Sequence, residues 1–288
     1  MNIAWIGTGV MGAAMLQHLQ QAGHVLHIFN RSYAKAAALA RDGIIVHKEL
    51  AACVREAEVV ITMVGYPKDV EEIYTGKDGI FAHAKRGCIL IDMTTSSPSL
   101  ARKLARQATE LGFSMLDAPV SGGDSGAKAA TLSIMCGGER AVFDRAVPLL
   151  SLMGSSLHYI GEAGSGQHCK ACNQIAVAGA VAAMSEAIVY ARTNGVDPEV
   201  MLNAIRGGAA GSWQINNTAP RVLKEDFAPG FYIKHFIKDM HIVQDAMKEQ
   251  GVSLDMLDQV CRMYEKLADE GEENNGTQAL LHYYTNRK

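Results

Sequence analysis

The chain has 288 residues, of which 48% are hydrophobic and 20% are charged, and its formal net charge is −3. A domain usually spans about 100–200 residues, so this length allows one large domain or two. Because no strong charge of either sign accumulates, we expect no nucleic-acid or membrane-surface partner. The opening "MNIAWIG" lacks a basic leader, and we identify no apolar run near the ~20 residues of a membrane span. These features predict a cytoplasmic protein that binds small molecules.

The six cysteines are scattered along the chain, which is typical of reduced thiols rather than of a disulfide framework. Cys169 and Cys172 form a CxxC pair, which occurs in zinc sites and in redox pairs. No second CxxC or HxxxH follows, and the pair lies in an Ala-rich helical stretch rather than after a thioredoxin-like strand. We therefore expect no metal site.

The first 160 residues alternate short β-branched runs with amphipathic stretches. Strands are expected at residues 2–7, 25–30, 59–65, 88–94, 114–120 and 132–138, and helices at 13–23, 32–43 and 98–112. Strands that alternate with helices of this kind predict right-handed crossovers. The fold class is therefore α/β, with a mostly parallel, doubly wound sheet of the Rossmann type.

The pattern changes after "HYIGEAGSG", because residues 167 to about 270 contain almost nothing that resembles a strand. Helices are expected at residues 172–195, 197–208, 236–251 and 254–271. Their apolar residues recur at helical spacing, and glycines follow their ends. We expect an α/β domain at residues 1–162 and an all-helical domain at residues 163–288.

The first motif is "GTGVMG", which follows the first expected strand and opens the first helix. This is the context that a dinucleotide-binding G-x-G-x-x-G requires. Gly7 permits the tight turn, Gly9 lets backbone amides approach the pyrophosphate, and Gly12 allows close packing of helix on strand. We expect the loop, including Val10 and Met11, to bind the cofactor.

The second strand ends in "IFNRS", where an enzyme built for NAD usually places Asp or Glu to bind the ribose 2′-hydroxyl. This chain has Asn30, Arg31 and Ser32 instead. A guanidinium binds a 2′-phosphate through paired charge-assisted hydrogen bonds. The alternative is a solvated surface arginine. The segment predicts NADP(H) as the preferred cofactor, with NAD(H) still possible.

The segment "DAPVSGG" at residues 117–123 suggests a site for an anion. The backbone amides of Gly122 and Gly123 and the hydroxyl of Ser121 are donors that suit a carboxylate. The alternative is an ordinary turn that leaves a strand, since Pro, Ser and Gly are common in turns.

The segment "GSGQHCKACNQ" at residues 164–174 places Lys170 and Asn173 at i and i+3, on one face of a helix. A helical lysine is usually a solvated surface charge. Here the helix continues with apolar and small residues, so its faces are expected to be covered. A covered lysine beside an amide suggests a functional role.

The chain resembles the β-hydroxyacid dehydrogenases, a family that includes 3-hydroxyisobutyrate dehydrogenase and tartronate semialdehyde (2-hydroxy-3-oxopropionate) reductase. The resemblance extends over essentially the whole chain. The motifs that carry it, in order, are "GTGVMG", "DMTTSSP" at 92–98, "DAPVSGG", "GSGQHCKACNQ" and "KHFIKDM" at 234–240. It implies a Rossmann domain followed by a helical domain like that of 6-phosphogluconate dehydrogenase, and a homodimer or homotetramer.

The resemblance also implies a role for each matching residue. Lys170 would be the catalytic acid or base, Asn173 would orient it and the substrate, and residues 121–123 would hold the substrate carboxylate. The other positions that match cofactor- or substrate-contacting residues are Met63, Val64, Gly65, Thr95, Lys238 and Asp239. The family usually has Leu-Pro where this chain has Val64 and Gly65. We expect a small change in cofactor fit there, without loss of binding.

These observations predict an NADP(H)-linked enzyme that interconverts a short aldehyde acid and its β-hydroxy acid, with Lys170 as general acid and base. One alternative is an imine reductase-like enzyme, a group that commonly replaces this lysine. Another is 6-phosphogluconate dehydrogenase, which is longer and binds a sugar phosphate. A cofactor-binding module without turnover, or a structural oligomer on an α/β scaffold, is the alternative outside enzymes.

Overall fold

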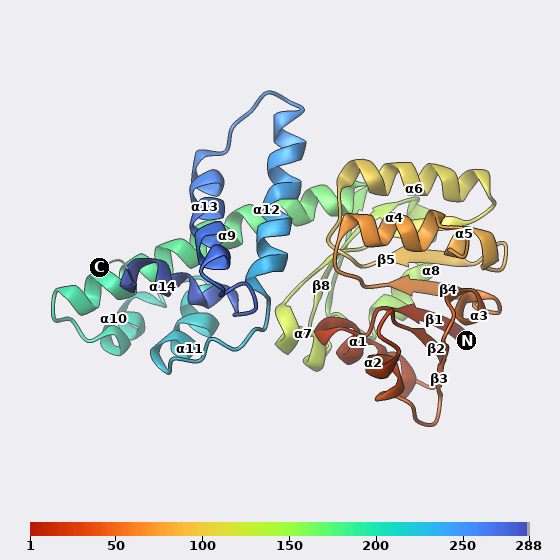
Figure 1. The fold of residues 1–288 in the computed structure, drawn as a ribbon, viewed down its shortest axis with the longest axis horizontal. Helices are drawn as coiled ribbons and strands as arrows, with labels where there is room; N and C mark the ends of the chain where they lie inside the picture. The colour runs from red at the N-terminus through yellow and green to blue at the C-terminus, as the bar shows by residue number, and fades with distance from the viewer. Residues whose placement is uncertain (287–288) are drawn as a thin grey trace. The chain divides into compact units, whose positions relative to one another are not determined.

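The computed structural model describes residues 1–286, which divide into two compact units. The first unit comprises Met1–Lys170 and the second begins at Ala171. The first unit carries the sheet, and the second is helical (Figure 1).

The sheet of the first unit has the strand order β3-β2-β1-β4-β5-β6-β8-β7, with β9 paired to β8. Strands β1 to β6 are parallel to one another, whereas β8 runs antiparallel to β6 and β7. The strands are β1 (Asn2–Ile6), β2 (Val25–Phe29), β3 (Ile44–Val46), β4 (Val59–Thr62), β5 (Ile89–Asp92), β6 (Ser114–Asp117), β7 (Val120–Ser121), β8 (Ser133–Gly138) and β9 (Ser156–Gly161). From β1, the chain adds β2 and β3 on one side and then β4, β5 and β6 on the other, so the direction of strand addition reverses beside β1. Ligands of open α/β sheets bind at such a point, outside the carboxyl ends of the strands.

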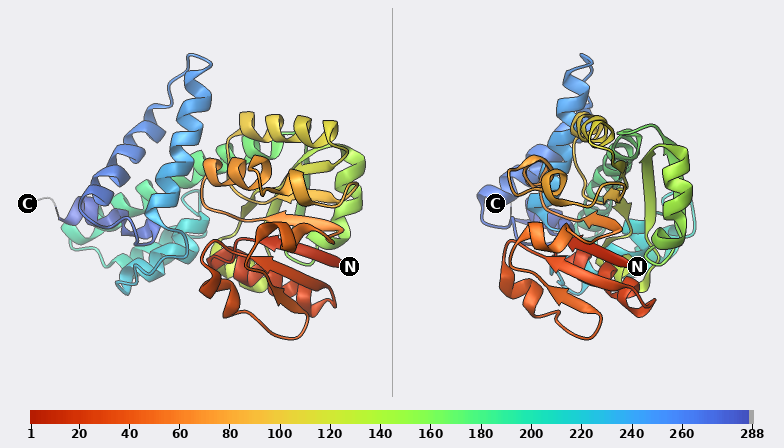
Figure 2. Two further views of the ribbon diagram at one scale, coloured as in Figure 1. Left: turned by 45° about the vertical axis from the view of Figure 1, so that its right-hand side comes forward. Right: turned by 90° about the vertical axis from the view of Figure 1, so that its right-hand side faces the viewer.

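Helices cover both faces of this sheet (Figures 1 and 2). They are α1 (Val10–Gln21), α2 (Tyr33–Ala37), α3 (Leu50–Val54), α4 (Pro67–Thr75), α5 (Ile80–His83), α6 (Pro98–Glu110), α7 (Gly123–Ala129) and α8 (Arg140–Leu150). Strand β1 shows how the two layers form. Its Ile3 and Trp5 pack into the core cluster shared with α1 and α8, while Ala4 and Ile6 pack into the cluster shared with α4 and α6. Successive side chains of a strand point to opposite faces, so a continuous apolar strand can serve both layers.

The second unit consists of helices around its own apolar core. They are α9 (Ser165–Thr193), which begins in the first unit, α10 (Pro198–Ile205), the π-helical turn η1 (Gln214–Thr218), α11 (Ala219–Leu223), α12 (Ile233–Lys248), α13 (Asp255–Asp269), the 3-10 turn η2 (Thr277–Ala279) and α14 (Leu280–Thr285). Helices α12 and α13 run side by side as a hairpin (Figure 2).

Helix α9 is long and apolar enough, by length and composition, to cross a membrane. This corrects the expectation that no apolar run approaches that length. Within the second unit, α9 contributes Ala178, Val181, Met184 and Ile188 to the core. Buried residues that recur every three or four positions are typical of a core helix, and such helices meet the same criterion.

The predicted fold class is confirmed, with a mostly parallel sheet followed by helices. Two helices differ most from their expected bounds: the helix expected at 32–43 ends at Ala37, and the helix expected at 172–195 begins at Ser165. The strands β3, β7 and β9 and the helices α3, α4, α5, α7, α8, α11 and α14 were not predicted. The predicted domain boundary at residues 162 and 163 falls just before α9, and its functional meaning stays a prediction.

Candidate active site

The loop between β1 and α1 has the geometry of a dinucleotide-binding turn. A side chain at Gly7 would collide with the carbonyl oxygen of Met63, and one at Gly12 would collide with the Gly7 carbonyl. Gly7 also has φ +100°, which favours glycine. These two positions therefore hold the loop tightly against β4 and bring α1 close to β1.

The same loop leaves room where a phosphate would lie. A Cβ added at Gly9 would meet no atom within 4 Å. The hydroxyl oxygen of Thr8 is buried without a hydrogen-bond partner, and buried polar groups normally have one. Open space beside an unpaired hydroxyl at a helix N-terminus fits a pyrophosphate group.

The end of β2 is tied to this loop through Asn30. Its Oδ1 accepts from the backbone N–H of Thr8 at 3.1 Å, and its Nδ2 donates to the carbonyl of Ser32 at 3.0 Å. Arg31 follows, with 87% of its side chain exposed, and its Nη1 lies 3.2 Å from Oδ1 of Asp69 in the first turn of α4. The guanidinium is thus available to a ligand but already faces a carboxylate.

The loops after β4 and β5 are held in register by buried hydrogen bonds. Thr62 Oγ1 donates to Asp92 Oδ1 at 2.8 Å, and the same oxygen accepts from the N–H of Thr94 at 3.1 Å. Thr94 Oγ1 in turn accepts from the N–H of Val64 at 3.0 Å. This series of hydrogen bonds fixes the segment of Val64 and Gly65. The family usually has Leu-Pro at these two positions.

Gln167 anchors the start of α9 to the loop after β5. Its Nε2 donates to the Thr94 carbonyl at 2.7 Å, and its Oε1 accepts from the Ser96 N–H at 2.9 Å. All three residues are almost fully buried. Lys170 follows one helical turn later on the same face, so these bonds help to set the position of the lysine backbone.

Asp117 holds the same end of α9 from β6. Its Oδ1 accepts from the Gly164 N–H at 2.7 Å and its Oδ2 from the Gln167 N–H at 2.9 Å, groups that have no partner within the helix. Burial raises the pKa of Asp117 to about 6, although these two bonds oppose the shift. The carboxylate is therefore a fixed N-terminal cap whose charge is lost near that pH.

The segment of residues 121–123 joins β7 to α7. Gly122 has φ +132° and Gly123 has φ +65°, so both adopt backbone that side chains rarely occupy. A Cβ at Gly123 would meet no atom within 4 Å. The segment turns sharply into a helix N-terminus beside open space, which is compatible with an anion. Asp124 follows, and its carboxylate is paired with Lys128 at 3.1 Å.

Lys170 is buried, with 7% of its surface exposed. A solvated surface lysine is therefore excluded, but the expectation that the faces of this helix are covered is met only in part, because residues such as Cys172, Ala176 and Tyr190 of α9 are exposed. Thr95 is half-buried in the loop that carries Thr94 and Ser96. Val10 and Ser32 are exposed, whereas Met11 is partly buried against the core.

In the second unit, four polar side chains form a connected row. Asn173 Nδ2 donates to Gln174 Oε1 at 2.7 Å, and Gln174 Nε2 donates to Asp239 Oδ2 at 2.6 Å. Lys238 Nζ lies 2.6 Å from Asp239 Oδ1, with both side chains largely buried. Gln174 and Asp239 therefore position Asn173 on α9 and Lys238 on α12.

Residue types at single positions did not reveal Asp117, Gln167 and Gln174 as positioning residues. A usable signal lay in the motifs themselves. Gln167 precedes Lys170 by three residues and Gln174 follows Asn173, inside an otherwise small and apolar helix. Amides on a covered helix require hydrogen-bond partners, which would have suggested a role.

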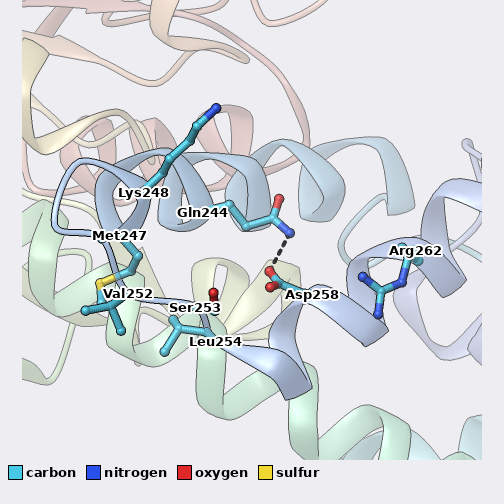
Figure 3. Close-up of a pocket in the computed structure, with 9 residues that line it drawn as sticks. Gln244, Met247, Lys248, Val252, Ser253, Leu254, Asp258 and Arg262 are labelled. Atoms are coloured by element: carbon cyan, nitrogen blue, oxygen red, sulfur yellow. Dashed lines mark hydrogen bonds between the residues drawn. The ribbon is translucent and has the colours of Figure 1, made fainter.

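A separate hollow of about 460 Å³ lies between the end of α12 and the start of α13 (Figure 3). Gln244 Nε2 donates to Asp258 Oδ1 at 2.9 Å across it. Its lining residues are Gln244, Met247, Lys248, Gly251, Val252, Ser253, Leu254, Asp258 and Arg262. None of these is a predicted site residue.

One group of possible metal ligands lies nearby on the same helices. His241 Nε2 is 2.7 Å from Glu265 Oε1, and the Cys261 thiol lies with them, all three ligand atoms within 4.8 Å of one another. The buried thiol has a pKa raised to about 12 by burial and by the Glu265 carboxylate. Cys172 of the CxxC pair is exposed on α9.

Comparison with known proteins places these features in a family. Residues 2–161 match the model described as the NAD binding domain of 6-phosphogluconate dehydrogenase. Residues 164–284 match the model described as NAD-binding of NADP-dependent 3-hydroxyisobutyrate dehydrogenase. The chain belongs to the β-hydroxyacid dehydrogenase family.

Similar proteins match this β-hydroxyacid dehydrogenase along most of its length. The uncharacterized oxidoreductase YkwC of Bacillus subtilis is 49% identical over 279 residues, which cover 97% of each chain. The 2-hydroxy-3-oxopropionate reductase of Escherichia coli is 38% identical over 255 residues, which cover 88% of this chain and 87% of that protein. A solved structure of Mycobacterium tuberculosis 3-hydroxyisobutyrate dehydrogenase with L-serine has a TM-score of 0.89 and 33% identity, covering 100% of this chain and 99% of that one.

As a β-hydroxyacid dehydrogenase, the protein is an NAD(P)-dependent oxidoreductase that acts on the CH–OH group of a small molecule. The geometry of the β1–α1 loop agrees with the nicotinamide cofactor of the family. The bound cofactor supplies hydride chemistry, and the protein aligns the substrate and handles one proton.

Proposed function

We propose that the protein reduces short aldehyde acids to β-hydroxy acids and catalyses the reverse oxidation, with NADP(H) as preferred cofactor and Lys170 as general acid and base. The observation that carries this proposal is the burial of Lys170 one turn after the doubly anchored start of α9. Burying a lysine costs free energy, so a lysine kept at a buried position of this site supports a role in the reaction. A cytoplasmic location and a homodimer or homotetramer remain part of the proposal.

Lys170 would handle the proton at the substrate oxygen. In reduction, the lysine ammonium donates its proton to the oxygen of the former aldehyde, which becomes the hydroxyl group. In oxidation, the neutral amine accepts the hydroxyl proton, and the carbon–oxygen double bond forms. Burial disfavours the charged form of a lysine in general, which makes proton exchange near neutral pH easier.

The substrate class is supported by the segment of residues 121–123 and by the relatives. Backbone donors at the start of α7 and the Ser121 hydroxyl suit a carboxylate. The E. coli relative is named for 2-hydroxy-3-oxopropionate, and the solved M. tuberculosis structure contains L-serine. Both compounds are three-carbon acids with oxygen on the β-carbon, and we extend this class to the present chain.

The cofactor preference is supported by Arg31 and by the lack of a carboxylate at the end of β2. The exposed guanidinium can turn towards a 2′-phosphate. Asn30, which in this fold occupies the region of an NAD-type acidic residue, is engaged with Thr8 and Ser32.

The test is a substrate screen with the purified enzyme, following the loss of NADPH absorbance. Glyoxylate, succinic semialdehyde, methylmalonate semialdehyde and tartronate semialdehyde are compared with propionaldehyde, which lacks the acid group. A site with dedicated donors rejects a ligand that leaves them unpaired, so the best acid should exceed propionaldehyde in kcat/KM by at least ~10³-fold. Comparable values for the acids and propionaldehyde would refute a carboxylate site.

A further inference from the structure

The carboxylate that is missing from the end of β2 has a counterpart on α4. Asp69 lies in the first turn of α4, and its Oδ1 is 3.2 Å from Arg31 Nη1. These two residues are 38 positions apart in sequence. This ion pair between the end of β2 and the first turn of α4 brings an acid to the region where a dinucleotide-binding fold contacts the ribose.

The two partners differ in how firmly they are held. Asp69 Oδ2 accepts from the backbone N–H of Tyr66 at 3.1 Å, which closes a capping box, and 12% of the Asp69 side chain is exposed. Arg31 has 87% of its side chain exposed. The carboxylate is therefore fixed by the fold, while the guanidinium can move with little cost, since exposed ion pairs are weak.

The position of the pair follows from the sheet order. Strands β2 and β4 flank β1, whose carboxyl end carries the glycine loop. Arg31 comes after β2 and Asp69 comes from the helix after β4, so their contact spans the carboxyl end of β1. A dinucleotide lies across this end of the sheet. Its adenosine half must therefore pass close to both charges.

We propose that Asp69 sets the cofactor selectivity of this enzyme by opposing Arg31. With NADPH, the fixed carboxylate competes with the 2′-phosphate for the guanidinium and repels the phosphate. With NADH, the same carboxylate accepts a hydrogen bond from the free 2′-hydroxyl. The enzyme thus retains use of both cofactors, with a preference for NADPH that Asp69 limits. This inference rests on the proposed role of Arg31 in cofactor binding.

The test is the substitution Asp69→Asn, with dissociation constants for NADPH and NADH measured by fluorescence without substrate. Asn keeps an oxygen that accepts from the Tyr66 N–H, so α4 remains capped. Removing one neighbouring charge in a largely solvated site changes the binding free energy by about 1–2 kcal/mol, which corresponds to about tenfold in affinity. We expect NADPH to bind about tenfold more tightly and NADH about threefold more weakly.

Glu72→Gln is the matched control, because it removes the same charge from α4 at an exposed position one turn later. It should change both dissociation constants by the same small factor. Adenosine 2′,5′-bisphosphate and 5′-AMP serve as competitors that differ in the 2′-phosphate alone, and Asp69→Asn should strengthen binding of the former only. Equal effects of Asp69→Asn and Glu72→Gln on the NADPH-to-NADH ratio would overturn the inference.

This experiment separates the inference from the proposed substrate. If no aldehyde acid is reduced, the binding measurements still report on Asp69. A second outcome is that Arg31→Ala weakens the binding of NADPH and of NADH equally while Asp69→Asn still changes the ratio of the two dissociation constants. That result would refute the role of Arg31 and retain direct repulsion of the 2′-phosphate by Asp69. If neither substitution changes the ratio, both are refuted.

Discussion

The hydrogen bonds of Gln167 lead to a quantitative prediction for Gln167→Met. Methionine matches the length of glutamine but cannot replace either bond, so the Thr94 carbonyl and the Ser96 N–H lose their contacts with Gln167. Thr94 and Ser96 are 1% and 2% exposed, so water does not readily take over. An unpaired buried polar group costs about 1–3 kcal/mol. After partial relaxation, we expect the free energy of unfolding to fall by about 3 kcal/mol.

The matched control is Gln107→Met on α6. The Oε1 atom of Gln107 is buried and has no hydrogen-bond partner, so the same chemical change removes an unsatisfied group. Replacing such a group by an apolar one is neutral or stabilising. We therefore expect Gln107→Met to leave stability unchanged or raise it slightly.

Urea unfolding, followed by the fluorescence of one tryptophan, compares the stability of the two glutamine variants in the first unit alone. The chain has two tryptophans, and Trp5 is fully buried in β1, so a Trp213→Phe background leaves a reporter of this unit. With a slope of about 2 kcal/mol/M, a loss of 3 kcal/mol lowers the midpoint by ~1.5 M. A shift under about 0.3 M, or equal shifts for the two glutamine variants, would refute the anchoring role of Gln167.

Three further predictions concern the site itself. Lys170→Ala should lower kcat by roughly 10²–10⁴ while NADPH affinity, measured by fluorescence, stays nearly unchanged, and normal turnover would remove Lys170 from the mechanism. Burial raises the pKa of Asp117 to about 6, so the native state binds this proton more tightly than the unfolded chain does. The free energy of unfolding, relative to Asp117→Asn, should therefore fall by about 2 kcal/mol as pH rises from ~4 to ~6.5, and a difference between the two unfolding curves that does not change with pH would contradict this. Ser121→Ala should raise KM for the best aldehyde acid about 10-fold and leave KM for propionaldehyde unchanged. Ser125→Ala removes an exposed hydroxyl of α7 that makes only a long hydrogen bond of 3.4 Å, to the Gly122 carbonyl, and it should change neither KM.

The sequence allowed the sheet, the glycine loop and the covered lysine to be predicted because each depends on local patterns. Gly7 and Gly12 follow from spacing after a strand, and the covering of Lys170 follows from the apolar residues after it. Contacts between distant segments have no such signal. The Arg31–Asp69 pair joins the end of β2 to the first turn of α4, two segments that the sheet order brings together.

Short elements were also beyond local patterns. Strand β7, Val120–Ser121, has two residues and exists because it pairs with β8. Helix α2 ends at Ala37 although the alanine-rich sequence could continue as a helix. Tertiary pairing, which propensity does not encode, decides such boundaries.

The anchored start of α9 determines where the chain can be truncated to give a nucleotide-binding fragment that folds on its own. Most two-domain chains are separated experimentally in a loop, and residues 162 and 163 offer such a point in the sequence. A nucleotide-binding fragment that ended there would lack Gly164 and Gln167, and with them the donors to Asp117 and the partners of Thr94 and Ser96. The carboxylate of Asp117 would then stay in the fragment without the two backbone N–H groups that it accepts from. An autonomous fragment must therefore keep the first turns of α9, and with them Lys170.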